Sequence, residues 1–149
     1  MASDLPFLIW VDCEMTGLDT KSDALVEIAV LITDAQLNVI GQGVDFVIKC
    51  DQADGMSEVV RKMHEDSGLL KEIPNGVSLE AADSAIEEYL TKYQVAPGKS
   101  PLAGNSVYMD RAFIARDLPK LNSFLHYRTI DVSTIKELAR RWYPKTYFS

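Results

Sequence analysis

The sequence predicts an α/β domain in which helices flank a mixed five-stranded sheet. Strand-like apolar runs follow one another in the first third of the 149 residues, and helical and strand-like patterns alternate after them. The predicted order is β-β-β-α-β-α-β-α, and three consecutive strands imply that the sheet begins antiparallel. Because no repeat, low-complexity tract or linker interrupts this order, residues 1–149 are expected to form a single domain.

The three consecutive strands are expected in the first third of the chain. Residues 7–11 form an apolar run that leads into an acidic segment, which indicates a buried strand ending in a turn. Residues 24–32 form a second apolar run. A third strand is expected over residues 37–48, with a bend at Gly41 and Gly43.

Residues 78–94 have the clearest helical pattern. Apolar side chains recur there at steps of three and four residues, and Ser78 is placed to cap the first turn. A short strand over residues 102–104 is expected to lead into a second helix over residues 108–117.

The last predicted elements are a fifth strand over residues 127–131 and a helix over residues 132–142. Thr134 and Glu137 have the spacing of a capping box for this helix. The helix is expected to stop before Pro144, because proline cannot continue it.

The acidic composition limits the kind of ligand that the chain can bind. Its net charge is −7 and its pI is near 4.8, whereas tight binding of long duplexes depends on many Lys and Arg side chains at the phosphates. Carboxylates that hold divalent metal ions can still attract a phosphate, because the ions reverse the local field. A short nucleic acid held at its ends therefore fits this composition better than a long one.

The sequence also indicates a cytoplasmic protein with no membrane partner. No apolar stretch approaches the roughly 20 residues that span a bilayer, and residues 1–4 have no basic region typical of a secretory signal. The two cysteines, Cys13 and Cys50, show neither metal-ligand spacing nor a disulfide framework.

Asp12 and Glu14 are the first candidate site residues. Residues i and i+2 of a strand project from the same face, so the two carboxylates would point to one place while Cys13 points the other way. A cation between them would relieve their repulsion, and hard oxygen ligands suit Mg²⁺ or Mn²⁺. The alternative is an exposed strand end with two solvated acids.

Asp110 and Asp131 are further acidic candidates. Asp110 lies one turn into the helix that follows Gly104, Asn105 and Ser106, where backbone N–H groups and small polar side chains could bind a phosphate. It could supply a third carboxylate or simply favour the helix macrodipole. Asp131, at the end of the fifth strand, could be an N-cap or a site residue.

Three side chains that can bind phosphate occur in a row at His126, Tyr127 and Arg128. Strand alternation would place His126 and Arg128 on one face and Tyr127 on the other. A surface triplet at the start of a strand is the alternative. His64 lies in a predicted helix beside two acids, and this setting predicts a solvated surface histidine.

Residues 10–19 (WVDCEMTGLD), 104–110 (GNSVYMD) and 126–142 together resemble the oligoribonuclease family. This family belongs to the exonucleases named for four acidic residues and a histidine. The resemblance extends over essentially the whole chain. It implies a ribonuclease-H-like fold and 3′-to-5′ hydrolysis of very short RNA, dinucleotides especially, to mononucleotides.

The resemblance also implies roles for individual residues. Asp12, Glu14 and Asp110 are the implied ligands of two Mg²⁺ or Mn²⁺ ions and, with Tyr127, the implied catalytic residues. In such a centre one ion activates a water molecule and the other stabilises the leaving 3′ oxygen.

The substrate-binding residues are likewise carried over from the family. Leu18 is implied to wedge against the terminal bases, and Asn105 and Ser106 to hold the phosphates. The family is dimeric, and residues 126–128 are implied to reach into the partner's site and to cap the substrate's 5′ phosphate.

The sequence departs from the family pattern after Tyr143 and Pro144. In the family the pattern continues into a helix that bears a histidine and a fourth aspartate. These roughly thirty residues do not follow Ser149 in this sequence. The histidine would assist deprotonation of the attacking water. Neither His64 nor His126 matches it. Residues 1–149 alone are therefore expected to be nearly inactive.

Two other functions remain open from the sequence. The same fold could degrade DNA, as proofreading exonucleases do, because contacts to the 2′-OH cannot be read from the chain. A catalytically impaired module that binds short RNA is the non-enzymatic alternative, although it leaves the acidic pair without a purpose.

Overall fold

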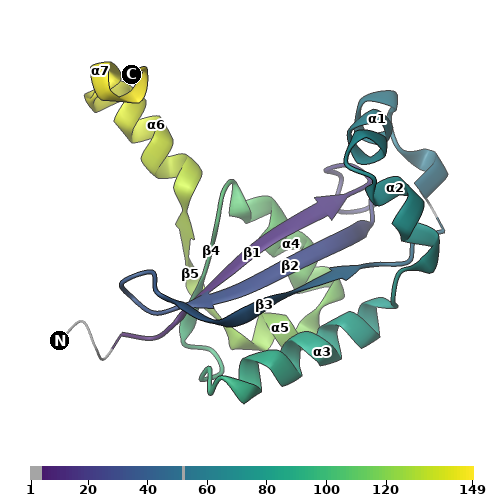
Figure 1. Cartoon of the computed structure of the whole chain (residues 1–149), viewed down its shortest axis with the longest axis horizontal. Helices are drawn as coiled ribbons and strands as arrows, with labels where there is room; N and C mark the ends of the chain where they lie inside the picture. Colours follow the sequence, from purple (N-terminus) through teal and green to yellow (C-terminus); the bar gives the residue numbers. More distant parts are fainter. Residues whose placement is uncertain (1–4, 52) are drawn as a thin grey trace.

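The computed structural model describes residues 5–51 and 53–149, so the expectation about residues 1–4 lies outside the described part of the chain. A five-stranded sheet of order β3-β2-β1-β4-β5 forms its centre. The strands are β1 (Leu8–Met15), β2 (Leu25–Thr33), β3 (Val39–Val47), β4 (Ser100–Gly104) and β5 (Leu125–Asp131). β1, β2 and β3 pair antiparallel, whereas β4 and β5 are parallel to β1 and to each other. The predicted mixed sheet with an antiparallel start is confirmed (Figure 1).

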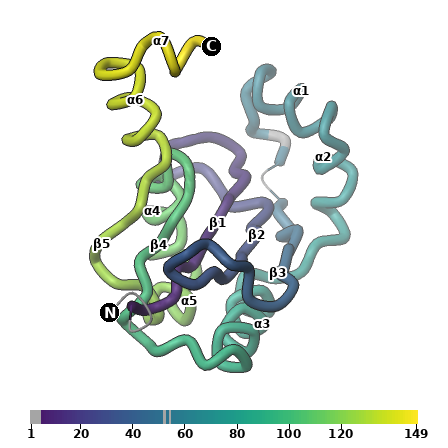
Figure 2. The backbone as a smooth tube through the Cα atoms, turned by 60° about the vertical axis from the view of Figure 1, so that its left-hand side comes forward, coloured from purple at the N-terminus to yellow at the C-terminus, as the bar shows by residue number. Residues whose placement is uncertain are grey.

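Three helices cover one face of the sheet, and the others lie at its end (Figure 1). The α-helices are α1 (Glu58–Asp66), α2 (Leu69–Glu72), α3 (Leu79–Lys92), α4 (Val107–Asp117), α5 (Pro119–Phe124), α6 (Val132–Trp142) and α7 (Pro144–Tyr147). α3, α4 and α5 form the covering layer. The α1–α2 pair and the α6–α7 arm lie on opposite sides of the end of β1 in both views (Figures 1 and 2). None of the described helices has the length and apolar character needed to cross a membrane.

β1 is longer than the sequence suggested. It continues past Val11 to Met15, because β2 pairs with this whole segment, with Asp12 opposite Ala29 and Glu14 opposite Glu27. The acidic residues therefore lie within the strand and not in a turn after it.

The bend predicted in the third strand is present. The pairing of β2 with β3 is irregular between Val30 and Ile32. Gly41 has φ +73°, and a Cβ atom there would lie 2.3 Å from the Tyr93 ring, so both backbone conformation and space require glycine.

The helix caps were predicted with mixed success. Ser78 caps α3 as expected, and its Oγ accepts from the Ala81 backbone N–H at 3.1 Å. The capping box at Thr134 is wrong. β5 pairs with β4 as far as Asp131, so the helix begins directly after it and Asp131 is the N-cap.

The main hydrophobic core lies between the sheet and its covering helices, and Phe113 of α4 is fully buried in it. Phe113→Ala should lower the free energy of unfolding by about 3–5 kcal/mol, because it removes buried apolar surface and leaves a cavity. Urea denaturation would measure this. Tyr108→Ala, on the same helix but 68% exposed, should change it by no more than about 0.5 kcal/mol. Equal effects of both substitutions would contradict this packing.

Candidate active site

Asp12 and Glu14 lie at the carboxyl end of the central strand β1. Val11 and Cys13 alternate with them and are buried against the helix layer, whereas Asp12 is exposed and Glu14 half-buried on the open face. The prediction that the two acids share one face, with Cys13 on the other, is confirmed. Central-strand ends of this kind are where α/β active sites concentrate.

Asp110 is brought to the same strand from the first turn of α4. It is only 7% exposed, and its Oδ1 accepts from the Cys13 backbone N–H at 2.8 Å. That N–H lies between Asp12 and Glu14 in the strand, so three acids gather around one peptide unit. A favourable interaction with the helix macrodipole alone therefore does not explain the position of Asp110, because its carboxylate contacts β1.

The negative charges of these three acids repel one another. Burial raises the pKa of both Glu14 and Asp110, and the nearby Asp12 carboxylate raises them further. Burial and the Asp110 carboxylate also raise the pKa of the Cys13 thiol, which faces away from Asp12 and Glu14. In the described part of the chain, no three His, Cys, Asp or Glu side chains already converge closely enough to enclose a metal ion.

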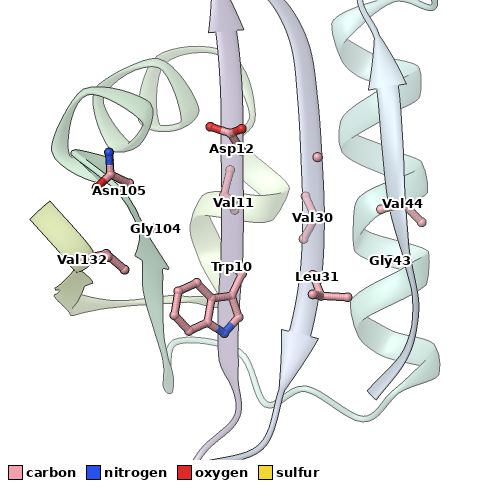
Figure 3. Close-up of a pocket in the computed structure, with 11 residues that line it drawn as sticks. Trp10, Val11, Asp12, Val30, Leu31, Gly43, Val44, Gly104, Asn105 and Val132 are labelled. Carbon is pink, nitrogen blue, oxygen red and sulfur yellow. The ribbon is translucent and has the colours of Figure 1, made fainter. Parts of the chain in front are cut away.

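A groove of about 490 Å³ lies on the open face beside Asp12. Trp10 and Asp12 project into it from β1, and Asn105 and Val132 line its other side (Figure 3). Gly104 permits this arrangement, because a Cβ atom there would lie 2.7 Å from the Val11 carbonyl oxygen. The groove could hold an elongated ligand next to the acids.

The loop between β4 and α4 is fixed by Asp131. Ser106 has φ +53°, and its backbone N–H donates to Asp131 Oδ1 at 2.9 Å. Asp131 Oδ1 also accepts from the Ser133 N–H and hydroxyl. Burial is the largest single influence on the pKa of Asp131 and raises it, but the hydrogen bonds together outweigh burial and hold the pKa below its ordinary value. Asp131 is thus an N-cap that joins α6 to the loop of Asn105.

Leu18 lies on a loop that follows β1, and its side chain is 66% exposed. Asp23 closes this loop by accepting from the Thr16 hydroxyl at 2.9 Å and the Asp19 N–H at 2.8 Å. Arg116 of α4 donates to the Thr20 and Asp23 carbonyl oxygens at 2.6 and 2.9 Å. Sequence analysis did not identify either residue, because the Arg116 contacts join residues 96 and 93 positions apart and those of Asp23 depend on the conformation of the loop.

The prediction of a solvated His64 is wrong. The side chain is 1% exposed, and Nε2 lies 2.9 Å from the Met15 carbonyl oxygen. Nδ1 lies 3.9 Å from Glu14 Oε2. The reason is that α1 packs against the end of β1, which turns His64 inward although its sequence neighbours are acidic.

His126, Tyr127 and Arg128 are remote from the acids of their own chain. Thr129 is level with Leu102, and Leu102 is level with Ile9. Arg128 lies one residue before that level, and His126 about two, because Leu125 is already level with Ser100. Asp12 lies three residues after it, so the offset is about 13–17 Å along the strands. His126 and Arg128 line one groove of about 400 Å³ while Tyr127 is 77% exposed outside it, which confirms the predicted alternation.

The fold and the acidic strand end define a nuclease of the ribonuclease-H-like class, and comparisons with known proteins agree. The exonuclease family model (RNase T) matches residues 9–148, so the chain belongs to this family. The oligoribonuclease of Mycobacterium tuberculosis (strain ATCC 25177 / H37Ra) is 56% identical over 144 residues, which cover 95% of this chain and 67% of that protein. For the oligoribonuclease of Streptomyces griseus the identity is 53%, with coverages of 95% and 72%.

Solved structures confirm the fold. Escherichia coli exonuclease I in complex with a 5cy-dA13 oligonucleotide superimposes with a TM-score of 0.68 at 19% identity, over 94% of this chain. A product-bound exonuclease I structure gives 0.69 at 20% identity, over 95% of the chain. The chain spans about a third of the length of these proteins (31% and 33%), and the likeness concerns the ribonuclease-H-like fold alone.

Proposed function

We propose that this protein hydrolyses short RNA from the 3′ end, dinucleotides especially, as an oligoribonuclease. The observation that carries the proposal is the gathering of Asp12, Glu14 and Asp110 around the Cys13 peptide unit in a chain 56% identical to an oligoribonuclease. Its two free cysteines suit a reducing compartment, and we place the protein in the cytoplasm.

Asp12, Glu14 and Asp110 would hold two Mg²⁺ or Mn²⁺ ions. The donor set fits these hard cations, because all three ligands are carboxylates whose mutual repulsion a cation offsets. When bound, such ions activate water and stabilise the leaving oxygen. The chain's own contribution is to fix the carboxylates: the Cys13 N–H orients Asp110, and the β1–β2 pairing orients Asp12 and Glu14.

The substrate would be held on both sides of these acids. Leu18 is exposed on a loop that Asp23 and Arg116 hold in place, which suits a rigid wedge against the terminal bases. Asn105 lines the groove beside Asp12 and, with the Ser106 side chain, would bind phosphate. The Ser106 N–H already donates to Asp131, so the hydroxyl is the donor that we assign to the ligand.

We further propose a homodimer in which residues 126–128 complete the partner's site. An offset of about 13–17 Å along the strands separates residues 126–128 from the acids of their own chain. Tyr127 is nevertheless 77% exposed, and Arg128 and His126 can pair with a phosphate. A closed twofold arrangement would let each chain cap the 5′ phosphate bound by the other, and Tyr127 would then act in catalysis in trans.

Titration with Mn²⁺ by isothermal calorimetry tests the metal centre. Asp12→Ala should weaken Mn²⁺ binding by at least about 100-fold, because it removes a carboxylate ligand directly. Asp66→Asn, an exposed acid on α1, is the matched control and should bind Mn²⁺ like the unmodified chain. If Asp12→Ala left the affinity unchanged, the two-metal proposal would fail, and a module that only binds short RNA would account better for the site.

A further inference from the structure

His64 is the single fully buried side chain of α1. Burying an imidazole is unfavourable unless its nitrogens find partners, and Nε2 lies 2.9 Å from the Met15 carbonyl oxygen. A carbonyl oxygen can only accept, so Nε2 carries the hydrogen and donates it. This bond fixes the ring and directs the other nitrogen, Nδ1, to the opposite side.

Nδ1 faces Glu14. Its distance to Glu14 Oε2 is 3.9 Å, which is too long for a hydrogen bond but within the range of an ion pair. Among the described residues, no hydrogen bond and no other ion pair contacts the Glu14 carboxylate, whereas Asp110 is held by the Cys13 N–H. The other charged groups beside Glu14 in the described chain are acids (Asp12, Glu27 and Asp110), so His64 is the one group among them that can attract its carboxylate.

The position of α1 is itself tied to the strand end. The β1–β2 register shifts between Glu14 and Met15 and leaves Val26 without a partner in β1. Val26 is fully buried in a second hydrophobic cluster with Met56, Leu69 and Ile73, on the α1–α2 side of the sheet. An irregularity of this kind changes the direction of the side chains beside it. Here it lets Val26, next to the end of β1, pack against the segment that supplies His64.

We infer that His64 is a positioning residue that fixes the direction of the Glu14 carboxylate toward the metal ions. The inference rests on the proposed role of Glu14 as a metal ligand. A purely structural role, in which His64 only attaches α1 to Met15, is the alternative that the experiment must separate.

Two substitutions separate the contributions of the two ring nitrogens of His64. In His64→Gln the amide nitrogen can reach the position of Nε2 and keep the bond to Met15, but nothing remains at Nδ1. In His64→Asn the amide lies near the position of Nδ1, facing Glu14, and the bond to Met15 is lost. We expect His64→Gln to weaken Mn²⁺ binding about 10- to 100-fold, as loss of a group that orients a metal ligand does. His64→Asn should lower the thermal unfolding midpoint more but the Mn²⁺ affinity less.

A double-mutant cycle with Glu14→Gln identifies the route of the effect. If His64 acts through Glu14, His64→Gln should weaken Mn²⁺ binding in the unmodified chain but cause no further loss in the Glu14→Gln background. Equal losses in both backgrounds, or no loss in either, would overturn the inference. Glu14→Gln alone distinguishes failure of this inference from failure of the proposed metal centre. If Glu14→Gln binds Mn²⁺ like the unmodified chain, the proposed metal centre itself fails.

A measurement on the unmodified chain keeps the inference testable if a variant does not fold. The chain has two histidines, so NMR of the imidazole ring signals resolves both during a titration with Mg²⁺. The His64 signals should shift as the ions bind. Unmoved His64 signals at saturating Mg²⁺ would refute a role in positioning Glu14.

Discussion

Asp110→Asn should slow the Mn²⁺-dependent hydrolysis of a 5′-labelled diribonucleotide by about three orders of magnitude in a single-turnover assay, when the variant and its unsubstituted control are both extended by the histidine- and aspartate-bearing helix of the family pattern. Loss of a ligand carboxylate removes several kcal/mol of metal-centred stabilisation from the transition state, and about 4 kcal/mol corresponds to that factor. The substitution is informative because Asn retains Oδ1 as the acceptor for the Cys13 N–H, which lies 2.8 Å away. Only the charge is removed.

Folding should survive this substitution. Burial holds the pKa of Asp110 above its ordinary value, so above that raised pKa the ionised carboxylate lowers the stability of the fold, and a neutral amide removes this cost. The unfolding midpoint at neutral pH, without metal, should be unchanged or higher. A loss of rate accompanied by a collapse of the fold would mean that Asp110 is structural, and an unchanged rate would contradict the metal centre. Asp66→Asn again serves as the exposed control.

The parts of the site that depend on local geometry were predictable from sequence. Asp12 and Glu14 share a face because strand side chains alternate, and this holds wherever β1 lies in the sheet. The helix over residues 132–142 was predicted with the bounds of α6, because Pro144 marks where it must stop. In the described part of the chain α6 buries none of its residues, so this local signal identified the helix but not what its apolar side chains contact.

The parts that depend on tertiary contacts were not predictable. The sequence left Asp110 undecided between helix terminus and ligand, and the choice follows from the parallel pairing of β1 with β4, which brings α4 to Cys13. His64 was assigned to the surface because its neighbours are acidic, and it is buried by Met15, 49 residues away. α5, which begins at Pro119, has six residues, too few for a periodic pattern to reveal it.

The most demanding test of the proposed dimer is to mix two defective chains. In Asp12→Ala each site loses a metal ligand, and in Arg128→Ala each site loses the side chain that caps the 5′ phosphate. In the presence of Mn²⁺, neither protein alone should therefore bind a non-hydrolysable 5′-phosphorylated diribonucleotide analogue tightly. If Arg128 acts in trans, a heterodimer contains one site with both defects and one intact site. Random exchange of subunits should then restore about one quarter of the tight binding sites, which the calorimetric stoichiometry would measure.

The offset between Asp12 and Arg128 along the strands makes this outcome specific to a shared site. Thr129 is level with Ile9 through Leu102, so Arg128 lies on the far side of that level from Asp12, about 13 Å away along the strands and two strands across the sheet. Placing both substitutions in one chain and mixing it with Asp12→Ala provides the control, because no intact site can form. No recovery in the first mixture despite subunit exchange would show that each chain caps its own substrate, and tight binding by Arg128→Ala alone would show that Arg128 does not bind it.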